Sequence, residues 1–72
     1  MGKRKNIRDW RDEFKRNGGI LTQLYYQVAK ATGCQTVTAE RWFKMERTPR
    51  NEKAIAYLEK LTQIERTYLF RK

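Results

Sequence analysis

Residues 26–49, YQVAKATGCQTVTAERWFKMERTP, decide the fold of this chain. They predict two short helices joined by a turn of three or four residues. Ala29 is small enough to let a second helix approach closely, and Gly33 supplies the positive φ angle that a sharp turn needs. Such a unit can lay its second helix in the major groove of DNA. Small or apolar residues recur where two steeply crossing helices would touch, at Val28, Ala29, Gly33, Cys34, Ala39 and Trp42.

Residues 21–61 resemble the helix-turn-helix of Cro/CI-type (lambda-repressor-like) regulators of phages and bacteria. That family has an Ala, three residues, a Gly, and then hydrophobic positions one, six and nine residues beyond the Gly. The matching residues here are Ala29, Gly33, Cys34, Ala39 and Trp42. The Arg47-Thr48-Pro49 segment also resembles the family's exit from the recognition helix. The chain departs from the pattern in its small Ala39, in Cys34 at a Val-like position, and in having no Gly after the recognition helix.

The composition indicates one small basic domain. The chain has 72 residues, with 17 Lys and Arg against 8 Asp and Glu and a net charge of +9. This charge is typical of proteins that bind DNA or RNA, although a basic surface can also serve solubility or bind ribosomes and membranes. One cysteine and no histidine exclude an internal disulfide framework and a zinc site. We expect no cofactor, no small-molecule ligand, no membrane span, and a location in the cytoplasm of a bacterial or phage-infected cell, at the nucleoid.

Two segments are predicted along the chain. Residues 1–5 form a short basic arm that we expect to be flexible. It is either a solubilising tail or a segment whose Lys3, Arg4 and Lys5 reach phosphates or the minor groove. Residues 6–72 form a single all-α domain, a compact bundle of four or five helices with the helix-turn-helix at about residues 22–46.

Capping and breaking residues set the limits of the first two helices. Asn6 reads as the N-cap of the first helix, and Gly18-Gly19 end it. We expect Trp10 and Phe14, on the apolar side of this helix, to be core residues. Thr22 is the predicted cap of the second helix, which runs to about Thr32.

The second half of the chain is less well marked. Gln35 or Thr36 caps the third helix, which we expect to end near Glu46, and Asn51 caps a fourth. Thr62 and Glu65 make a capping-box pair that would begin a short fifth helix. Because no Gly or Pro intervenes, the fourth helix could instead continue to about residue 70.

An apolar cluster lies at the end of the chain, at Ile64, Tyr68, Leu69 and Phe70. It either closes the domain or stays partly exposed and pairs two subunits. Because so short a chain keeps such a cluster, we expect a homodimer formed through Tyr68, Leu69 and Phe70.

The outward face of the third helix carries the predicted base contacts: Thr36, Val37, Glu40 and Arg41. Arg41 can present a bidentate fork to guanine or pair with a phosphate, Val37 can pack on a thymine methyl, and Thr36 can bond a base edge. Glu40 would accept from cytosine or, as we prefer, hold Arg41 or Lys44 in place. The alternative is that this face is a solvated helix surface, although an exposed valine there has no evident role in folding.

Contacts with the DNA backbone are expected from residues around this helix: Gln23, Gln35, Lys44, Arg47, Thr48 and Arg50. Gln23 is chosen because, in the family that the chain resembles, polar residues at the start of the supporting helix grip the backbone. Gln35 lies at a helix N-terminus, where free backbone N–H groups favour an anion. The three residues after the recognition helix would flank the groove.

These features favour a sequence-specific DNA-binding regulator over an enzyme, since the chain lacks histidine and Cys34 lacks a general base. The resemblance implies a Cro-like repressor from a phage or mobile element that binds a palindromic operator as a dimer. Three other functions are compatible with the sequence. They are an RNA-binding or architectural protein, an antitoxin that regulates its own gene, and an antirepressor that binds protein through its terminal aromatic cluster.

Overall fold

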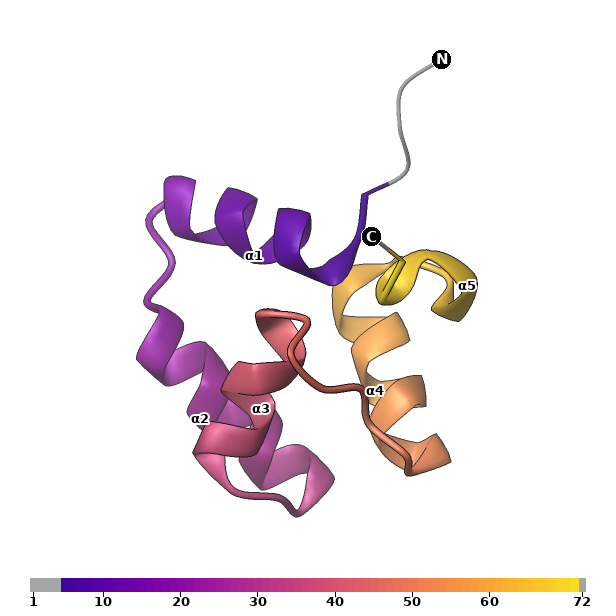
Figure 1. Cartoon of the computed structure of the whole chain (residues 1–72). Helices are drawn as coiled ribbons and strands as arrows, with labels where there is room; N and C mark the ends of the chain where they lie inside the picture. The colour runs from indigo at the N-terminus through magenta and orange to yellow at the C-terminus, as the bar shows by residue number, and fades with distance from the viewer. Residues whose placement is uncertain (1–4, 72) are drawn as a thin grey trace.

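The computed structural model describes residues 5–71, and within this range the chain is all-helical, as predicted. Its elements are α1 (Ile7–Arg16), α2 (Leu21–Thr32), α3 (Thr36–Phe43), α4 (Glu52–Thr62) and α5 (Arg66–Leu69). Figure 1 shows α1 crossing above the α2–α3 pair, with α4 and α5 packed on the other side. None of these helices is long and apolar enough to traverse a lipid bilayer, a finding that covers residues 5–71.

Asn6 caps α1, as predicted, and also ties the two ends of the chain together. Its side-chain oxygen accepts a hydrogen bond from Asp9 N at 2.9 Å, and the Asp9 carboxylate accepts one from Asn6 N at 3.2 Å. The Asn6 side-chain amide donates to the carbonyl of Arg71 at 2.9 Å. Asn6 therefore provides hydrogen-bond partners both for a backbone group at the start of α1 and for a backbone carbonyl beyond α5.

The predicted N-cap of α2 is wrong. Ile20 occupies the cap position in an extended conformation, and the Thr22 side chain makes no capping bond. Leu21 packs against the core as the first helical residue, so this apolar contact, rather than a capping side chain, fixes where the helix begins.

Helix α3 follows Gln35, one of the two caps expected, and ends at Phe43, before the predicted Glu46. Met45 has φ 62, its N–H donates to Trp42 O at 3.1 Å, and Glu46 N donates to Arg41 O at 2.9 Å. This is the Schellman ending that usually contains glycine. Met45 takes the left-handed conformation of the missing glycine while its side chain packs on the core.

Asn51 caps α4 as predicted, accepting from Lys53 N at 2.8 Å. The predicted Thr62–Glu65 capping box is wrong, because Thr62 is the last residue of α4 and its hydroxyl donates to Leu58 O at 2.7 Å. Gln63 then takes φ 61 and breaks the helix, so α4 does not continue to residue 70. A short fifth helix is present, but it begins at Arg66.

The core is one cluster to which every helix contributes. Its largest fully buried side chains are Ile7, Val28, Phe43, Leu58 and Leu69. As predicted, Trp10 and Phe14 pack against it from α1, with their rings stacked 5.3 Å apart. Leu69 is 0% exposed, so the end of the chain closes the domain, and this side chain is not available to a second subunit.

Candidate nucleic-acid interface

The interface begins with the way α2 positions α3. These two helices make the most extensive contact of any pair in the fold. Ala29 on α2 and Ala39 on α3 are 3% and 0% exposed, so the helices approach closely through small side chains. Gly33, with φ 76, makes the turn between them. The structure thus contains two crossed helices and a short turn, as the sequence predicts.

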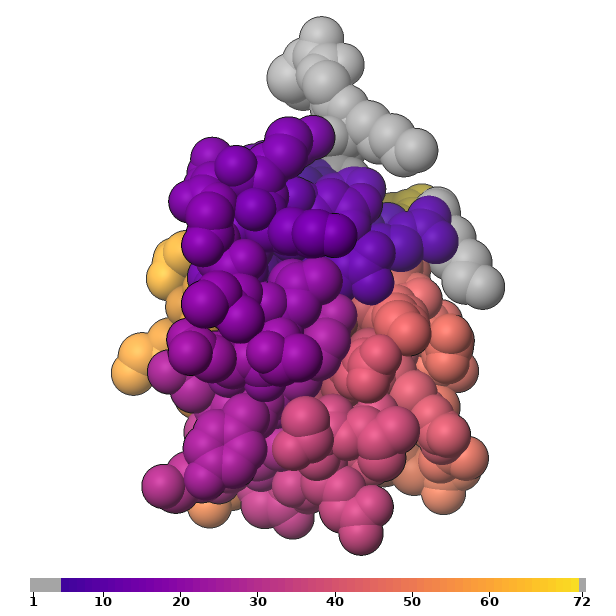
Figure 2. All heavy atoms as spheres, turned by 90° about the vertical axis from the view of Figure 1, so that its left-hand side faces the viewer, coloured from indigo at the N-terminus to yellow at the C-terminus, as the bar shows by residue number. Residues whose placement is uncertain are grey.

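The outward face of α3 lies open to solvent. Its buried side is formed by Ala39, Trp42 and Phe43, while Thr36, Val37 and Arg41 are exposed. Val37 exposes 46% of its surface. Within residues 5–71 the Arg41 side chain has no hydrogen-bond or ion-pair partner. Figure 2 shows α3 (pink) at the surface with no other helix over it.

Glu40 forms an ion pair with a residue one helical turn further along the chain. Its carboxylate lies 2.9 Å from Lys44 Nζ, one turn away on the same exposed side. The pKa of Lys44 is raised, first by the hydrogen bond that Lys44 donates to the Glu40 carboxylate and then by the negative charge of that carboxylate. The preferred role for Glu40, positioning a neighbouring cation, matches this geometry. Lys44 reaches the surface as a cation that is partly neutralised.

Backbone donors and loop cations flank the outward face of α3. Gln35 is exposed and its side chain does not cap the helix, so the N–H groups of Thr36 and Val37 have no hydrogen-bond acceptor among residues 5–71, whereas Thr38 N donates to Gln35 O. After α3, the exposed residues Arg47, Thr48 and Arg50 make no side-chain hydrogen bond or ion pair within the described part of the chain. Pro49 is buried between them and fixes the loop to the body. These donors fit the backbone of a duplex whose groove holds α3.

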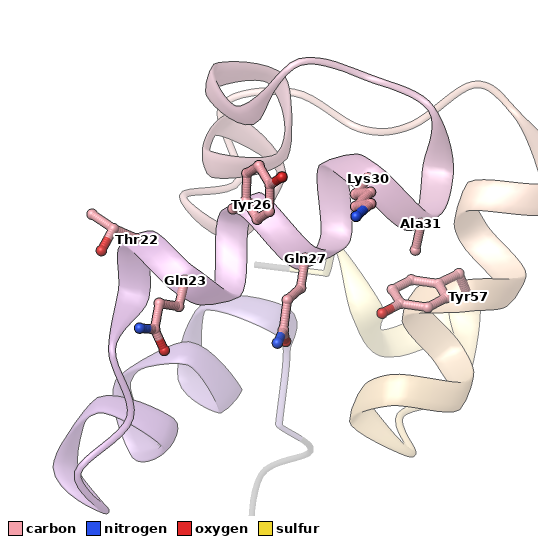
Figure 3. Close-up of a pocket in the computed structure, with 7 residues that line it drawn as sticks. All are labelled: Thr22, Gln23, Tyr26, Gln27, Lys30, Ala31 and Tyr57. Atoms are coloured by element: carbon pink, nitrogen blue, oxygen red, sulfur yellow. The ribbon is translucent and has the colours of Figure 1, made fainter.

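The structure does not bring Gln23 to this face. Gln23 and Gln27 point to the side of α2 that faces α4, where they line a shallow groove with Lys30, Ala31 and Tyr57 (Figure 3). The helical period alone could not show this, because it does not reveal on which flank of α2 the fourth helix packs. Gln23 is therefore not on the outward face of α3, and its contact with the DNA backbone stays a prediction.

Tyr26 is an exposed aromatic residue that the sequence analysis left out. Its ring lines the same shallow groove as Gln23 and Gln27, and Figure 3 shows it above the α2 ribbon with the two glutamines below. Its exposed fraction, 59%, is higher than that of any other large apolar side chain described. The signal was available in the sequence, because Tyr26 precedes Ala29 by three residues and so lies on the flank next to α3.

Of the three basic residues predicted to form an arm, the structure describes only Lys5. Lys3 and Arg4 lie outside the described residues. Lys5 Nζ lies 2.7 Å from Glu13 Oε2, and its hydrogen bond lowers the pKa of the Glu13 carboxyl. Lys5 is thus attached to α1, away from α3.

Comparison with known proteins identifies no relative: no protein-family model, curated protein or solved structure matches this chain. In residues 5–71 no three Cys, Asp or Glu side chains are grouped so that they could hold a metal ion.

Proposed function

We propose that this protein is a sequence-specific regulator that binds duplex DNA by placing α3 in the major groove. One observation carries the proposal. A short helix, locked to α2 through its buried side, presents a mixed face of Thr36, Val37 and Arg41 that has no role in the fold. A hydroxyl, a branched aliphatic group and a guanidinium fork suit base edges in the major groove.

The loop after α3 supports the same function. Arg47 and Arg50 are exposed cations without partners among residues 5–71. Phosphate contacts of this kind position a recognition helix and supply sequence-independent affinity. The Cro-like pattern, with Met45 in the backbone conformation where that family has a glycine, adds to the argument.

Dimeric binding is part of the proposal on geometric grounds. A single α3 reads only about four to six base pairs, so two copies on a palindromic site, roughly one helical turn apart, are needed for useful selectivity. Leu69 cannot join such an interface, whereas Tyr68 and Phe70 keep part of their surface exposed. We propose repression by occupation of promoter DNA, with the protein's own concentration as the control.

The test is selection of bound sequences from a random duplex pool. We expect a palindromic consensus with half-sites one turn apart. Titration of the selected duplex with random DNA and with RNA as competitors completes the experiment. Equal competition by all three would remove the regulator and leave a nonspecific nucleic-acid-binding protein.

A further inference from the structure

Charge is segregated on α1. Arg8, Arg11 and Lys15 follow one another at intervals of three and four residues, which places them on one flank of the helix. Asp9, Glu13 and Arg16 occupy the other exposed flank, and Asp12 lies at the border between the two, paired with Arg11. We call the first set the basic flank of α1. Within the described residues, the Arg8 and Lys15 side chains have no hydrogen-bond or ion-pair partner.

Arg11 places the basic flank beside the end of the recognition helix. Its guanidinium is held by Asp12, with Nη2 2.8 Å from Oδ1, and it also interacts with the Tyr25 hydroxyl. Burial lowers the pKa of Arg11, but Asp12 and Tyr25 more than reverse this effect, so the group stays charged. Tyr25 also contributes to the raised pKa of Lys44, after the larger effect of Glu40. Arg11 and Lys44 therefore both interact with the Tyr25 phenol.

The helices agree with this placement. α1 contacts α3 directly, and in Figure 1 the upper end of α3 lies beneath α1. In the perpendicular view of Figure 2, the indigo start of α1 lies directly above the salmon segment that follows α3. The basic flank thus adjoins the segment that carries Lys44 and Arg47.

We infer that the basic flank of α1 is a second phosphate-binding surface, with Arg8 and Lys15 contacting the duplex backbone while α3 occupies the groove. This inference rests on the proposed function and adds residues that read no sequence. Arg11 is fixed by Asp12 and Tyr25, so it reinforces the positive field between the two contacts. Asp12 lies between Arg8 and Lys15 on the helix but is paired with Arg11, whereas Lys44 shares its charge with Glu40. Arg8 and Lys15 are therefore free to contribute fully to the salt dependence.

The experiment compares two double variants that remove the same charge. Arg8→Gln with Lys15→Gln changes the basic flank. Lys53→Gln with Lys60→Gln removes two exposed lysines of α4 that have no ion pair among residues 5–71 and lie one turn before and after Tyr57, which lines the groove of Figure 3. The probe is a labelled random-sequence duplex, titrated at several salt concentrations, with circular dichroism to verify folding.

We expect the α1 variant to bind roughly tenfold or more weakly at about 0.1 M salt, and its salt slope to fall by close to two units. The α4 variant should keep nearly the wild-type slope. Equal, small losses in both variants would show a general effect of net charge and overturn the α1 contact while leaving the proposed function intact. If the wild-type protein has no affinity for duplex DNA, both the α1 contact and the proposed function are overturned.

Discussion

Lys44 Nζ lies 2.9 Å from Glu40 Oε2, so the cation that follows α3 has a counter-ion on the helix itself. Both side chains are partly exposed, 44% for Lys44 and 36% for Glu40, and the pair is therefore weak and exchangeable. A phosphate that approaches Lys44 must compete with the Glu40 carboxylate. The pair thus limits sequence-independent affinity at the helix proposed to read sequence.

The first prediction concerns Glu40→Gln. Removal of the carboxylate frees Lys44, so affinity for random duplex DNA should rise and the salt slope should steepen by about one phosphate contact. Fluorescence anisotropy titrations at several salt concentrations measure both. Glu65→Gln removes the same charge from an exposed residue of the α5 cap and should leave both unchanged. A loss confined to the selected site would instead show that Glu40 accepts from cytosine.

Arg41 is expected to determine sequence preference. Arg41→Ala should weaken binding to the selected site by about 1–3 kcal/mol and relax the preference at one base pair. Arg41→Lys keeps the charge but loses the bidentate fork, so it should retain random-DNA affinity and still lose that preference. Binding of single-base-pair variants of the site measures the effect. Unchanged selectivity in both proteins would assign Arg41 to the backbone.

Leu69 should stabilise the monomer. Because this side chain is wholly buried, Leu69→Ala should lower the free energy of unfolding by about 2–5 kcal/mol. Urea denaturation at two protein concentrations gives the value, which should not depend on concentration. Thr67→Ala, at an exposed position of α5, serves as the control. A mutant that unfolds like wild type but no longer self-associates would place Leu69 at a subunit interface.

The helix ends show how much of the fold the sequence could predict. The first two helices end at glycines with positive φ, Gly18 and Gly33, and both ends were predicted. The third and fourth end at Met45 and Gln63, which adopt the same conformation with a side chain present. Tertiary packing compels these two endings. Local sequence rules therefore placed the end of the third helix too late and left open whether the fourth helix ends before residue 70.

The candidate site divides in a similar way. The outward face of α3 could be predicted from the helical period, because the apolar residues identify the buried side and the remaining residues must then face outward. The position of Gln23 in a groove with Tyr57 could not be predicted, because the helical period does not tell which flank of α2 meets α4. The basic flank of α1 was missed because its relation to α3 depends on how two distant helices cross.

The left-handed conformation of Gln63 leads to a stability prediction. A non-glycine residue with φ 61 is strained by roughly 1 kcal/mol, and Gln63 is exposed. Gln63→Gly should therefore raise the free energy of unfolding by up to about 1 kcal/mol, less the entropy of the more flexible unfolded chain. Gln63→Ala keeps the strain and loses the hydrogen bond from Gln63 Nε2 to Lys60 O, so it should be less stable than wild type. Thermal unfolding of the three proteins tests this order, and a destabilised glycine variant would contradict it.

The last prediction concerns the ion pairs that attach α5 to α4. Arg66 lies 2.8 Å from Glu59 and 2.5 Å from Glu52, and the hydrogen bond from Arg66 lowers the pKa of Glu59. Because the pKa of Glu59 is lower in the folded than in the unfolded chain, its contribution is fully present above the unfolded pKa. The contribution is lost as the pH falls through the folded pKa. Glu59→Gln should therefore be less stable than wild type at neutral pH, and the difference should vanish at about pH 2. Thermal unfolding of both proteins across this range measures it, with Glu65→Gln as a control that has no ion pair in the described structure. A difference that persists unchanged at low pH would mean that Glu59 acts through packing and not through its charge.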